Sequence, residues 1–444
     1  MVYFYGMRSV GPNRKIKTIQ LIALIFLTVS GGPYGLEPLL AYVGQHTALM
    51  LLILTPLVWD LPTIATVLEL NSMMPVTGGY YQWVKRAMGL RWAFFEGWWT
   101  WLYTFADLAI YPVLFVMYLG FFFPEINAYK IPICLVLIWS STLLNILGIV
   151  PVGRISVVLG IIVLIPFIVL IVTALHQHID SISFQAQTFK GNSYPAIGMG
   201  IYTVMWNFIG WDNTTTYAEE VNKPIRAYLI SVAVSFLLIF TLYFLTVFIS
   251  QVSGIDVEVL KDKGYPALGT LVGGKWLGGF IAIGGMASAL GLYSSVLLSV
   301  SRVPQVMADD NLLPSKLHLL HSRYKTPYIS ILCCSLVVSM MIFWTFEDLL
   351  IIDVTLYGAA LILEFLALII LRIKAPDEHR PFKLPLGIAG LCIMILLPLC
   401  VYSIAVSAAF INTGQSYKPI LFASICLISA EVVWRIILHR KILH

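Results

Sequence analysis

The sequence predicts an all-α polytopic membrane protein with about twelve transmembrane helices. Of its 444 residues, 59% are hydrophobic and only 11% are charged, whereas soluble domains carry roughly 25% charged residues. Apolar segments of roughly 20 residues, the length needed to cross a bilayer, recur along the whole chain. The longest connectors, residues 175–195 and 250–276, are too short for a soluble domain, so residues 1–444 are expected to form a single transmembrane domain.

The predicted spans fall into two groups of five, followed by two more. Their centres lie near residues 28, 58, 106, 140, 163, 208, 238, 290, 336, 360, 397 and 428. The first five helices occupy residues 17–175, the second five residues 196–374, and helices eleven and twelve residues 385–438. Each group of five begins with an interrupted helix, which is the pattern of an inverted five-helix repeat.

The basic residues predict the topology. With the N-terminus inside, 21 of the 27 Lys and Arg residues fall on the inner side of the membrane, and six fall outside. This asymmetry follows the positive-inside rule for an even number of spans with both termini cytoplasmic. We therefore expect a lipid-embedded protein of the plasma or inner membrane, whose net charge of +5 anchors the cytoplasmic face and implies no nucleic-acid partner.

The first apolar segment is interrupted by SGGPYG at residues 30–35. Gly31 and Gly32 allow backbone conformations closed to other residues, and Pro33 cannot continue the hydrogen-bond ladder. Unwinding would leave the amides of Ser30, Gly31 and Gly32 free to bind a carboxylate beside the positive end of the next half-helix. The alternative is a Pro/Gly kink that only helps the helices to pack.

A second interruption lies in the sixth span, where WNFIGWDN at residues 206–213 contains the ionisable Asp212. Backbone groups freed inside a membrane have to be paired by protein, water or a ligand, because lipid offers no partner. Two broken helices at corresponding positions of two halves indicate the binding site of a secondary transporter. The two interruptions therefore predict movement of a small organic solute across a membrane.

Eight of the 22 acidic residues fall within predicted spans, namely Glu37, Asp60, Glu69, Glu96, Asp107, Asp212, Asp353 and Glu364. Ionisable residues at membrane depth are costly and mark function by default. Glu69, Glu96 and Glu364 lie toward span ends and are expected to be interfacial or structural. Asp60 and Asp353 fit either role.

Three of these acids lie where a substrate would bind. Asp107 lies near the centre of span three, Asp212 in the second interruption and Glu37 just after the first. With no buried Lys or Arg predicted beside them, they would attract a cationic solute or carry a proton. The alternative is that each carboxyl group stays protonated and hydrogen-bonds to a neighbouring backbone group.

Aromatic side chains surround the same positions: Tyr34, Tyr103, Tyr111, Trp206, Phe208, Trp211 and Tyr217. Tyr103 and Tyr111 flank Asp107 at a spacing of one helical turn. Such rings could contact an ammonium group through cation–π interactions and occlude it. Many Tyr and Trp residues only form interfacial belts, but Trp206 and Trp211 lie at mid-span, which favours a gate.

No feature of the sequence predicts an enzyme, a cofactor or a metal site. The six cysteines lie within or beside apolar segments, with neither metal-type spacing nor a loop pair for a disulfide. Nucleophile motifs and cofactor-binding loops are absent from the sequence, as is a channel filter. A membrane enzyme or a channel is the alternative from a different class.

Six stretches of the sequence match a known family: SGGPYGLE, MPVTGGYYQW, GWWTWLYTFADLAIYPVLF, MWNFIGWDNTTTYAEEVNKP, ADDNLLP and LYGAALILEFLALIILRIKAPDEHRPFKLPLG. Through them, the chain resembles the amino acid–polyamine–organocation transporter superfamily from span one through span eleven. It is strongest for the polyamine-uptake branch, which is similar to the L-type amino acid transporters. This resemblance implies a LeuT-type 5+5 inverted repeat with broken helices one and six, and a substrate held between spans one, three, six, eight and ten.

The resemblance also assigns roles to residues. Ser30, Gly31 and Gly32 match the unwound part of span one, and Trp206 matches the aromatic residue that gates substrate in related transporters. Together with the residues singled out above, the expected substrate-binding set is Ser30, Gly31, Gly32, Tyr34, Glu37, Tyr103, Asp107, Trp206, Asn207, Trp211, Asp212 and Tyr293. The candidates for carrying a coupled proton are Asp107, Asp212 and Glu37.

The sequence departs from the polyamine branch in span eight, where Val296 replaces a further acid. This departure weakens a polyamine as the substrate and favours a cationic or neutral amino acid. Related proton-coupled amino acid transporters use a lysine in span five, where this chain has only Arg154 at the cytoplasmic end. A carboxyl group would then have to carry the proton, although Ser294, Ser295 and Ser299 could instead form a sodium site.

Taken together, the sequence predicts a proton-coupled importer of a small amine-bearing solute, a polyamine or an amino acid, that works by alternating access. The nearest alternative is an obligate amino acid exchanger without ion coupling. Some relatives bind a glycoprotein through a disulfide in the loop after span three. That loop, FFFPEINAYK, has no cysteine, so we expect no disulfide-linked partner.

Overall fold

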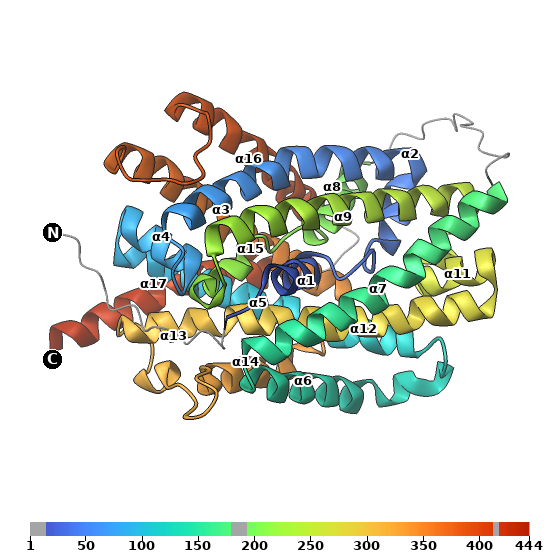
Figure 1. Cartoon of the computed structure of the whole chain (residues 1–444), viewed down its shortest axis with the longest axis horizontal. Coiled ribbons are helices and arrows are strands. Elements are labelled where there is room, and N and C mark those ends of the chain that lie inside the picture. Colours follow the sequence, from blue (N-terminus) through green and yellow to red (C-terminus); the bar gives the residue numbers. More distant parts are fainter. Residues whose placement is uncertain (1–14, 179–192, 412–416, 444) are drawn as a thin grey trace.

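The computed structural model describes residues 15–178, 193–411 and 417–443. Throughout these ranges the chain is helical, with two isolated bridges and no strand. Eight helices are long and apolar enough to cross a membrane, and three shorter apolar helices run among them. Figure 1 shows the helices lying lengthwise in one bundle. The expectation of an all-α polytopic membrane protein is confirmed.

The bundle is built from helices that follow the predicted spans. In the first half they are α1 (Thr18–Val29), α2 (Glu37–Thr55), α3 (Leu61–Met73), α5 (Leu90–Leu119), α6 (Lys130–Ile146) and α7 (Ile149–His178). In the second half they are α8 (Tyr194–Trp206), α9 (Pro224–Val252), α12 (Lys275–Val300), α14 (Tyr328–Met341), α15 (Phe346–Lys374), α16 (Ile388–Ile411) and α17 (Lys418–Leu443). Four shorter helices cap or connect them: α4 (Gly79–Met88), α10 (Val257–Lys263), α11 (Tyr265–Gly273) and α13 (Arg302–Asp309).

The first interruption lies between α1 and α2, as predicted. The amides of Ser30 and Gly31 both donate to the carbonyl oxygen of Phe26, at 3.0 and 2.8 Å. Gly31 and Gly32 have φ values of +60° and +98°, in the left-handed region that glycine adopts at helix ends. The segment is buried by the surrounding helices, so its backbone does not face lipid.

The second interruption follows α8, which ends at Trp206. Gly210 has a φ of +98°, and a 3-10 turn at Asn213–Thr216 follows it. Threonine hydroxyls in this turn donate to backbone carbonyls within it, which competes with helix formation. The second half of the sixth span is therefore made of short 3-10 turns until α9 begins at Pro224.

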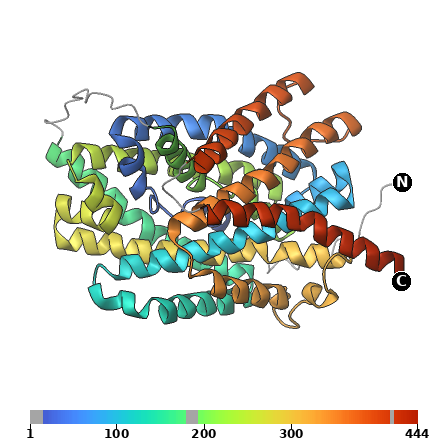
Figure 2. The same cartoon turned by 180° about the vertical axis from the view of Figure 1, so that it is seen from behind.

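Helix α5 is the central element that positions the site. Its 30 residues extend for about 45 Å, and it packs against α15, α12, α4 and α6. Helices α16 and α17 lie outside, with α16 against α8 and α17 against α5 and α15 (Figure 2). Within the connector at residues 250–276, α10 and α11 form, and α11 packs along α12.

Polar contacts close one end of the bundle, where α4 and α13 lie at the left of Figure 1. Lys85 of α4 pairs with Asp310 at 2.6 Å, and the buried Arg302 pairs with Glu220 at 2.6 Å. The amide of Gly78 donates to the carbonyl of Thr216 at 2.8 Å. These contacts connect α4 and α13 to the segment that follows the second interruption.

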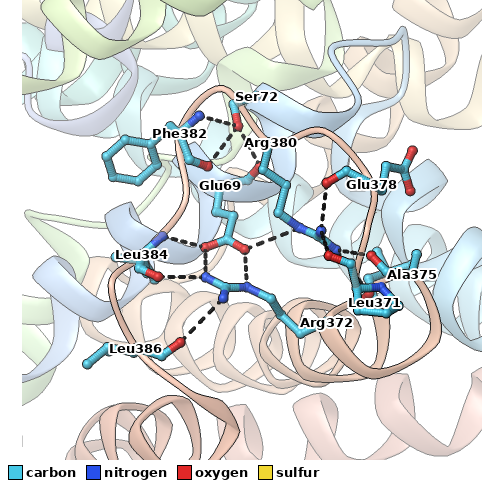
Figure 3. Close-up of polar contacts among 11 residues, drawn as sticks. Glu69, Ser72, Leu371, Arg372, Ala375, Glu378, Arg380, Phe382, Leu384 and Leu386 are labelled. Carbon is cyan, nitrogen blue, oxygen red and sulfur yellow. Dashed lines mark hydrogen bonds and ion pairs between the residues drawn. The ribbon is translucent and has the colours of Figure 1, made fainter.

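A buried ion pair fixes the linker between α15 and α16 (Figure 3). Glu69 of α3 accepts hydrogen bonds from Arg372 Nε and from Arg372 Nη2, the latter at 2.6 Å. Arg380 Nε lies 3.5 Å from the same carboxylate, and the amide of Leu384 donates to it at 2.8 Å. Of the two roles expected for Glu69, interfacial or structural, the structure shows the structural one, because its carboxylate holds residues 375–387 against α3.

We predict that Glu69→Gln lowers the free energy of unfolding by about 3–5 kcal/mol, because it leaves two buried guanidinium groups without their counter-ion. The measurement is thermal or denaturant unfolding of the purified protein in detergent. Glu431→Gln is the matched control, since Glu431 pairs with Arg91 and Arg435 in an exposed position, where such pairs contribute about 0–1 kcal/mol. Equal losses of unfolding free energy in the two variants would contradict the structural role of Glu69.

Candidate functional site

A small closed cavity lies where the two interruptions meet α5 and α12. It is lined by Thr28, Val29, Ser30, Tyr103, Asp107, Tyr111, Trp206, Asn207, Ile209, Gly210, Asn213 and Leu292. A water-sized sphere can be centred within only about 10 Å³ of this cavity. That is room for about one water molecule. In this conformation the cavity is therefore too small for an organic solute.

Two carboxyl groups from different helices face each other beside this cavity. Asp107 of α5 accepts a hydrogen bond of 2.5 Å from the hydroxyl of Tyr111, one turn along the same helix. Asp353 of α15 interacts electrostatically with Asp107, and the Trp206 indole lies beside both carboxyl groups. Both carboxyl oxygens of Asp353 are buried without a hydrogen-bond partner among the described residues.

Trp206 covers the cavity from the end of α8. Its ring packs edge-on against Phe346, with the centroids 5.6 Å apart. Gly35 lies on its other side, and a Cβ atom there would come within 2.4 Å of the ring. Trp206 can occupy this position because residue 35 is glycine, whose φ of +94° also disfavours other residues.

Three more acids form a second group, which we call the Glu96 cluster: Glu96 of α5, Asp212 and Glu364 of α15. The hydroxyl of Tyr357 donates to Asp212 at 2.9 Å. Electrostatic interactions connect Asp212 with Glu96 and Glu364. Glu96 and Glu364, which we expected at span ends in interfacial or structural positions, are 0% and 1% exposed and have no ion pair among the described residues. Their burial contradicts an interfacial position and leaves the structural role as the part of the prediction that is not contradicted.

The predicted site residues divide into two sets. Five of the twelve line the cavity: Ser30, Tyr103, Asp107, Trp206 and Asn207. The other seven do not line it: Gly31, Gly32, Tyr34, Glu37, Trp211, Asp212 and Tyr293. Their binding of substrate stays a prediction, and most of them have partners within the chain in this conformation.

The predicted nest of free amides is wrong for this conformation. The amides of Ser30 and Gly31 are capped by Phe26, as described above, and the amide of Gly32 donates to Ser30 Oγ at 3.0 Å. The sequence pattern marked where the helix breaks. The broken end then satisfies its own donors, as helix ends with glycine commonly do.

Tyr34 and Glu37 lie toward α7, α11 and α12 rather than at the cavity. The Tyr34 hydroxyl donates to the carbonyl of Ile281 at 2.6 Å. Glu37 accepts hydrogen bonds from the amide of Gly35, at 2.5 Å, and from the hydroxyl of Tyr118, at 2.8 Å. These bonds give Glu37 a role in holding the start of α2.

Trp211 and Tyr293 also point away from the cavity. The Trp211 indole nitrogen donates to Asp60 at 3.3 Å, which places Asp60 in a helix contact. Tyr293 lies beside Thr142 and Ser335 of α6 and α14. Its neighbour along α12, Leu292, lines the cavity instead.

Sequence reasoning missed several lining residues and, most importantly, the neighbour of Asp107. Asp353 could not be assigned to the site from its depth alone, because its position depends on how α5 and α15 pack. The lining residues that were missed are Thr28, Val29, Ile209, Gly210, Asn213 and Leu292. All of them lie within four residues of an interruption or beside a predicted residue, which is the signal that could have found them.

Two helices broken inside the bundle, at a small buried cavity that Asp107 lines, define a polytopic membrane transporter. The chain belongs to the amino acid permease family, whose family model matches residues 16–430. It is therefore an integral membrane transporter with a small-molecule substrate, and not an enzyme.

Individual relatives cover most of the chain. A probable polyamine transporter of Arabidopsis thaliana is 34% identical over 94% of this chain and 87% of its own length. The polyamine transporter PUT1 of Oryza sativa subsp. japonica is 32% identical over 87% of this chain and 72% of its own length. The serine/threonine exchanger SteT of Bacillus subtilis is 24% identical over 85% of this chain and 87% of its own length.

We predict that Gly35→Ala lowers uptake of labelled putrescine or arginine at least tenfold, because the added Cβ displaces the Trp206 ring. The measurement is uptake by reconstituted vesicles. Gly44→Ala is the matched control, since Gly44 also has a positive φ, of +70°, but has nothing within 4 Å of the added atom. Equal losses of uptake in both variants would show that backbone strain, and not Trp206, is responsible.

Proposed function

We propose that this transporter imports a small amine-bearing solute, a polyamine or an amino acid, together with protons, by alternating access. The solute would bind between the two interruptions, with its ammonium group beside Asp107 and Asp353 and with Trp206 closing over it. A carboxylate on the solute, where there is one, would bind at the first interruption after the amides of Ser30 to Gly32 are released. The relatives named as polyamine transporters support this class of substrate.

The observation that carries the proposal is a set of buried polar atoms that lack partners around the cavity. Asp353 Oδ1 and Oδ2, Asn207 Oδ1 and Thr28 Oγ1 have no partner within hydrogen-bonding geometry among the described residues. The Trp206 indole nitrogen, which lies beside Asp107 and Asp353, is an unpaired donor among the same described residues. A buried carboxyl group without a counter-charge or hydrogen bond is costly at membrane depth. An ammonium group has several donors and a positive charge, so it would satisfy these acceptors.

The carboxyl groups of Asp107 and Asp353 also indicate which kind of substrate the site favours. Val296 stands in span eight where the resemblance to the polyamine branch implies a further acid, and it is 0% exposed inside α12. Asp353 supplies a second carboxyl group beside Asp107 without that acid. Two carboxyl groups favour a solute with more positive than negative charge, such as a polyamine or a cationic amino acid.

Alternating access would follow from the two-fold organisation that the sequence predicts. We propose that residues 17–175 and 196–374 are inverted repeats, because each begins with a broken helix. We also propose that both termini are cytoplasmic, on the distribution of Lys and Arg. The contacts of Lys85 with Asp310 and of Arg302 with Glu220 would then form the cytoplasmic gate.

The experiment that tests this proposal is uptake into proteoliposomes that hold an inward proton gradient. Labelled putrescine and spermidine are compared with arginine and leucine. Uptake of an amine-bearing solute that stops when the gradient is collapsed would support proton-coupled import. Uptake that requires preloaded substrate and ignores the gradient would instead support the obligate exchanger, which the similarity to SteT makes the second candidate.

We predict that Asp107→Asn and Asp212→Asn each lower this uptake at least tenfold while the protein remains folded. Removing a charged partner from a desolvated site costs about 1.5–3 kcal/mol per hydrogen bond. Elution as a single species in detergent checks the fold, and Glu258→Gln, at an exposed position of α10, is the control that keeps uptake. Normal uptake by both aspartate variants would refute the assignment of these carboxyl groups.

A further inference from the structure

Helices α5 and α15 each carry two buried acids at the same spacing. On α5, Glu96 and Asp107 are 11 residues apart, and on α15, Asp353 and Glu364 are also 11 residues apart. Eleven residues are close to three helical turns, so the two acids of each helix lie on one face, separated by about 16 Å. Asp107 interacts with Asp353, and Glu96 interacts with Glu364, so the helices run antiparallel with an acid pair at each of two levels.

The second level, the Glu96 cluster, has no counter-charge within the described part of the chain. Asp212 adds a third carboxyl group there. The first basic residue further along α15, Arg372, is already paired with Glu69. Three buried carboxyl groups cannot all be ionised without a cation, so the cluster has to retain protons whenever it is closed off from water.

A neutral side chain also points to a ligand at this level. Tyr80 of α4 is 0% exposed, interacts electrostatically with Glu96, Asp212 and Glu364, and its hydroxyl has no hydrogen-bond partner among the described residues. Glu96 Oε2 and Glu364 Oε2 are unpaired as well. Buried polar atoms are nearly always paired, so these three atoms from α4, α5 and α15 form an incomplete hydrogen-bond network.

Two tyrosines connect the levels. Tyr103 lies one turn from Asp107 on α5, and Tyr357 lies one turn from Asp353 on α15. Their rings are in edge contact, with centroids 5.3 Å apart, and Tyr357 donates to Asp212. A change in the position of α15 relative to α5 at Asp107 and Asp353 would therefore move the Tyr357 hydroxyl, which donates to Asp212.

The cluster lies behind the gate at the α4 end of the bundle. Tyr80 comes from α4, which also carries the Lys85 contact to Asp310. Gly79, at the start of α4, packs so closely on Thr215 that an added Cβ would come within 2.2 Å of the threonine hydroxyl. Because α4 covers the cluster and contacts the broken span, opening this end would expose Glu96 and Glu364 to water.

We propose that Glu96 and Glu364, together with Asp212, form the site that carries the coupled proton, three helical turns away from the substrate site at Asp107 and Asp353. This inference rests on the proposed function, because it locates the proton in the proton-coupled import proposed above. The titratable groups that face the site are Glu96 and Tyr103 of α5, Glu364 and Tyr357 of α15, Tyr80 of α4, and Asp212. For import, the proton has to reach the cluster from the outer side of the membrane and leave it at the α4 end, and the solute does not occupy the cluster.

The test uses Glu364→Gln, which resembles a permanently protonated carboxyl group in shape and charge. Three quantities are measured in the full-length reconstituted protein: binding of labelled putrescine in detergent, putrescine–putrescine exchange at equal pH, and accumulation driven by an inward proton gradient. Substrate-dependent acidification of the vesicle lumen is followed with a trapped pH-sensitive dye. Glu96→Gln is the second variant, and Glu258→Gln is the control.

The expected result is that Glu364→Gln retains putrescine binding and exchange within about threefold of the unmodified protein. It loses at least about tenfold in gradient-driven accumulation and in lumen acidification, and Glu96→Gln behaves in the same way. Full accumulation and acidification in both variants would overturn the inference. Loss of putrescine binding in a folded variant would also overturn it, by placing the solute in the cluster.

The outcome for the unmodified protein separates this inference from the function on which it rests. Gradient-driven accumulation by the unmodified protein, retained in both glutamine variants, refutes only the location of the proton. Gradient-independent exchange by the unmodified protein refutes proton coupling itself and this inference with it.

Discussion

The structure depends on one constraint: inside a membrane, a polar group has to find its partner within the protein. The first interruption meets this constraint by capping its amides with Phe26 and with the Ser30 hydroxyl. Glu69 meets it with two arginines and a backbone amide. Unpaired buried atoms remain on several elements of the described chain, but four of the five unpaired carboxyl oxygens belong to Asp353, Glu96 and Glu364, on the facing helices α5 and α15. These oxygens are the ones that a cation could satisfy.

The small cavity is consistent with a site in which carboxyl oxygens lack partners. In a conformation that admits about one water molecule, the chain pairs the amides of Ser30 to Gly32, whereas both carboxyl oxygens of Asp353 remain unpaired beside the cavity. A cationic solute would therefore gain most of its binding energy from the carboxyl groups, and a solute carboxylate would first have to displace an existing backbone bond. This difference favours solutes with an excess of positive charge, because forming an ion pair with an unpaired acceptor costs less than breaking a helix cap.

The sequence predicted the fold to a large extent, because apolar length and the Pro/Gly interruptions are local signals. It placed both interruptions correctly and assigned Glu69 a structural role. It did not identify the partners of the acids, because depth in a span is a property of one helix, whereas the Asp107–Asp353 contact depends on two. For the same reason, it could not decide that Glu96 and Glu364 are buried and not interfacial. Tyr293 and Leu292 show the limit most clearly: adjacent residues on α12 point in directions about 100° apart, and the rotation of that helix decides which one lines the cavity.

The equal spacing of 11 residues on α5 and α15 was present in the sequence, but it acquires meaning only once the helices are known to lie antiparallel and in contact. A second acid pair at a distance of three turns allows a proton and a solute to be bound together without sharing one carboxyl group. Coupling then requires that each site senses the other, and the edge contact between Tyr103 and Tyr357 is a direct physical connection between them. Because Tyr357 donates to Asp212, a shift of α15 that accompanies solute binding would alter the hydrogen bonding of the Glu96 cluster. Such a shift would change the affinity of the Glu96 cluster for a proton without direct contact between the proton and the solute.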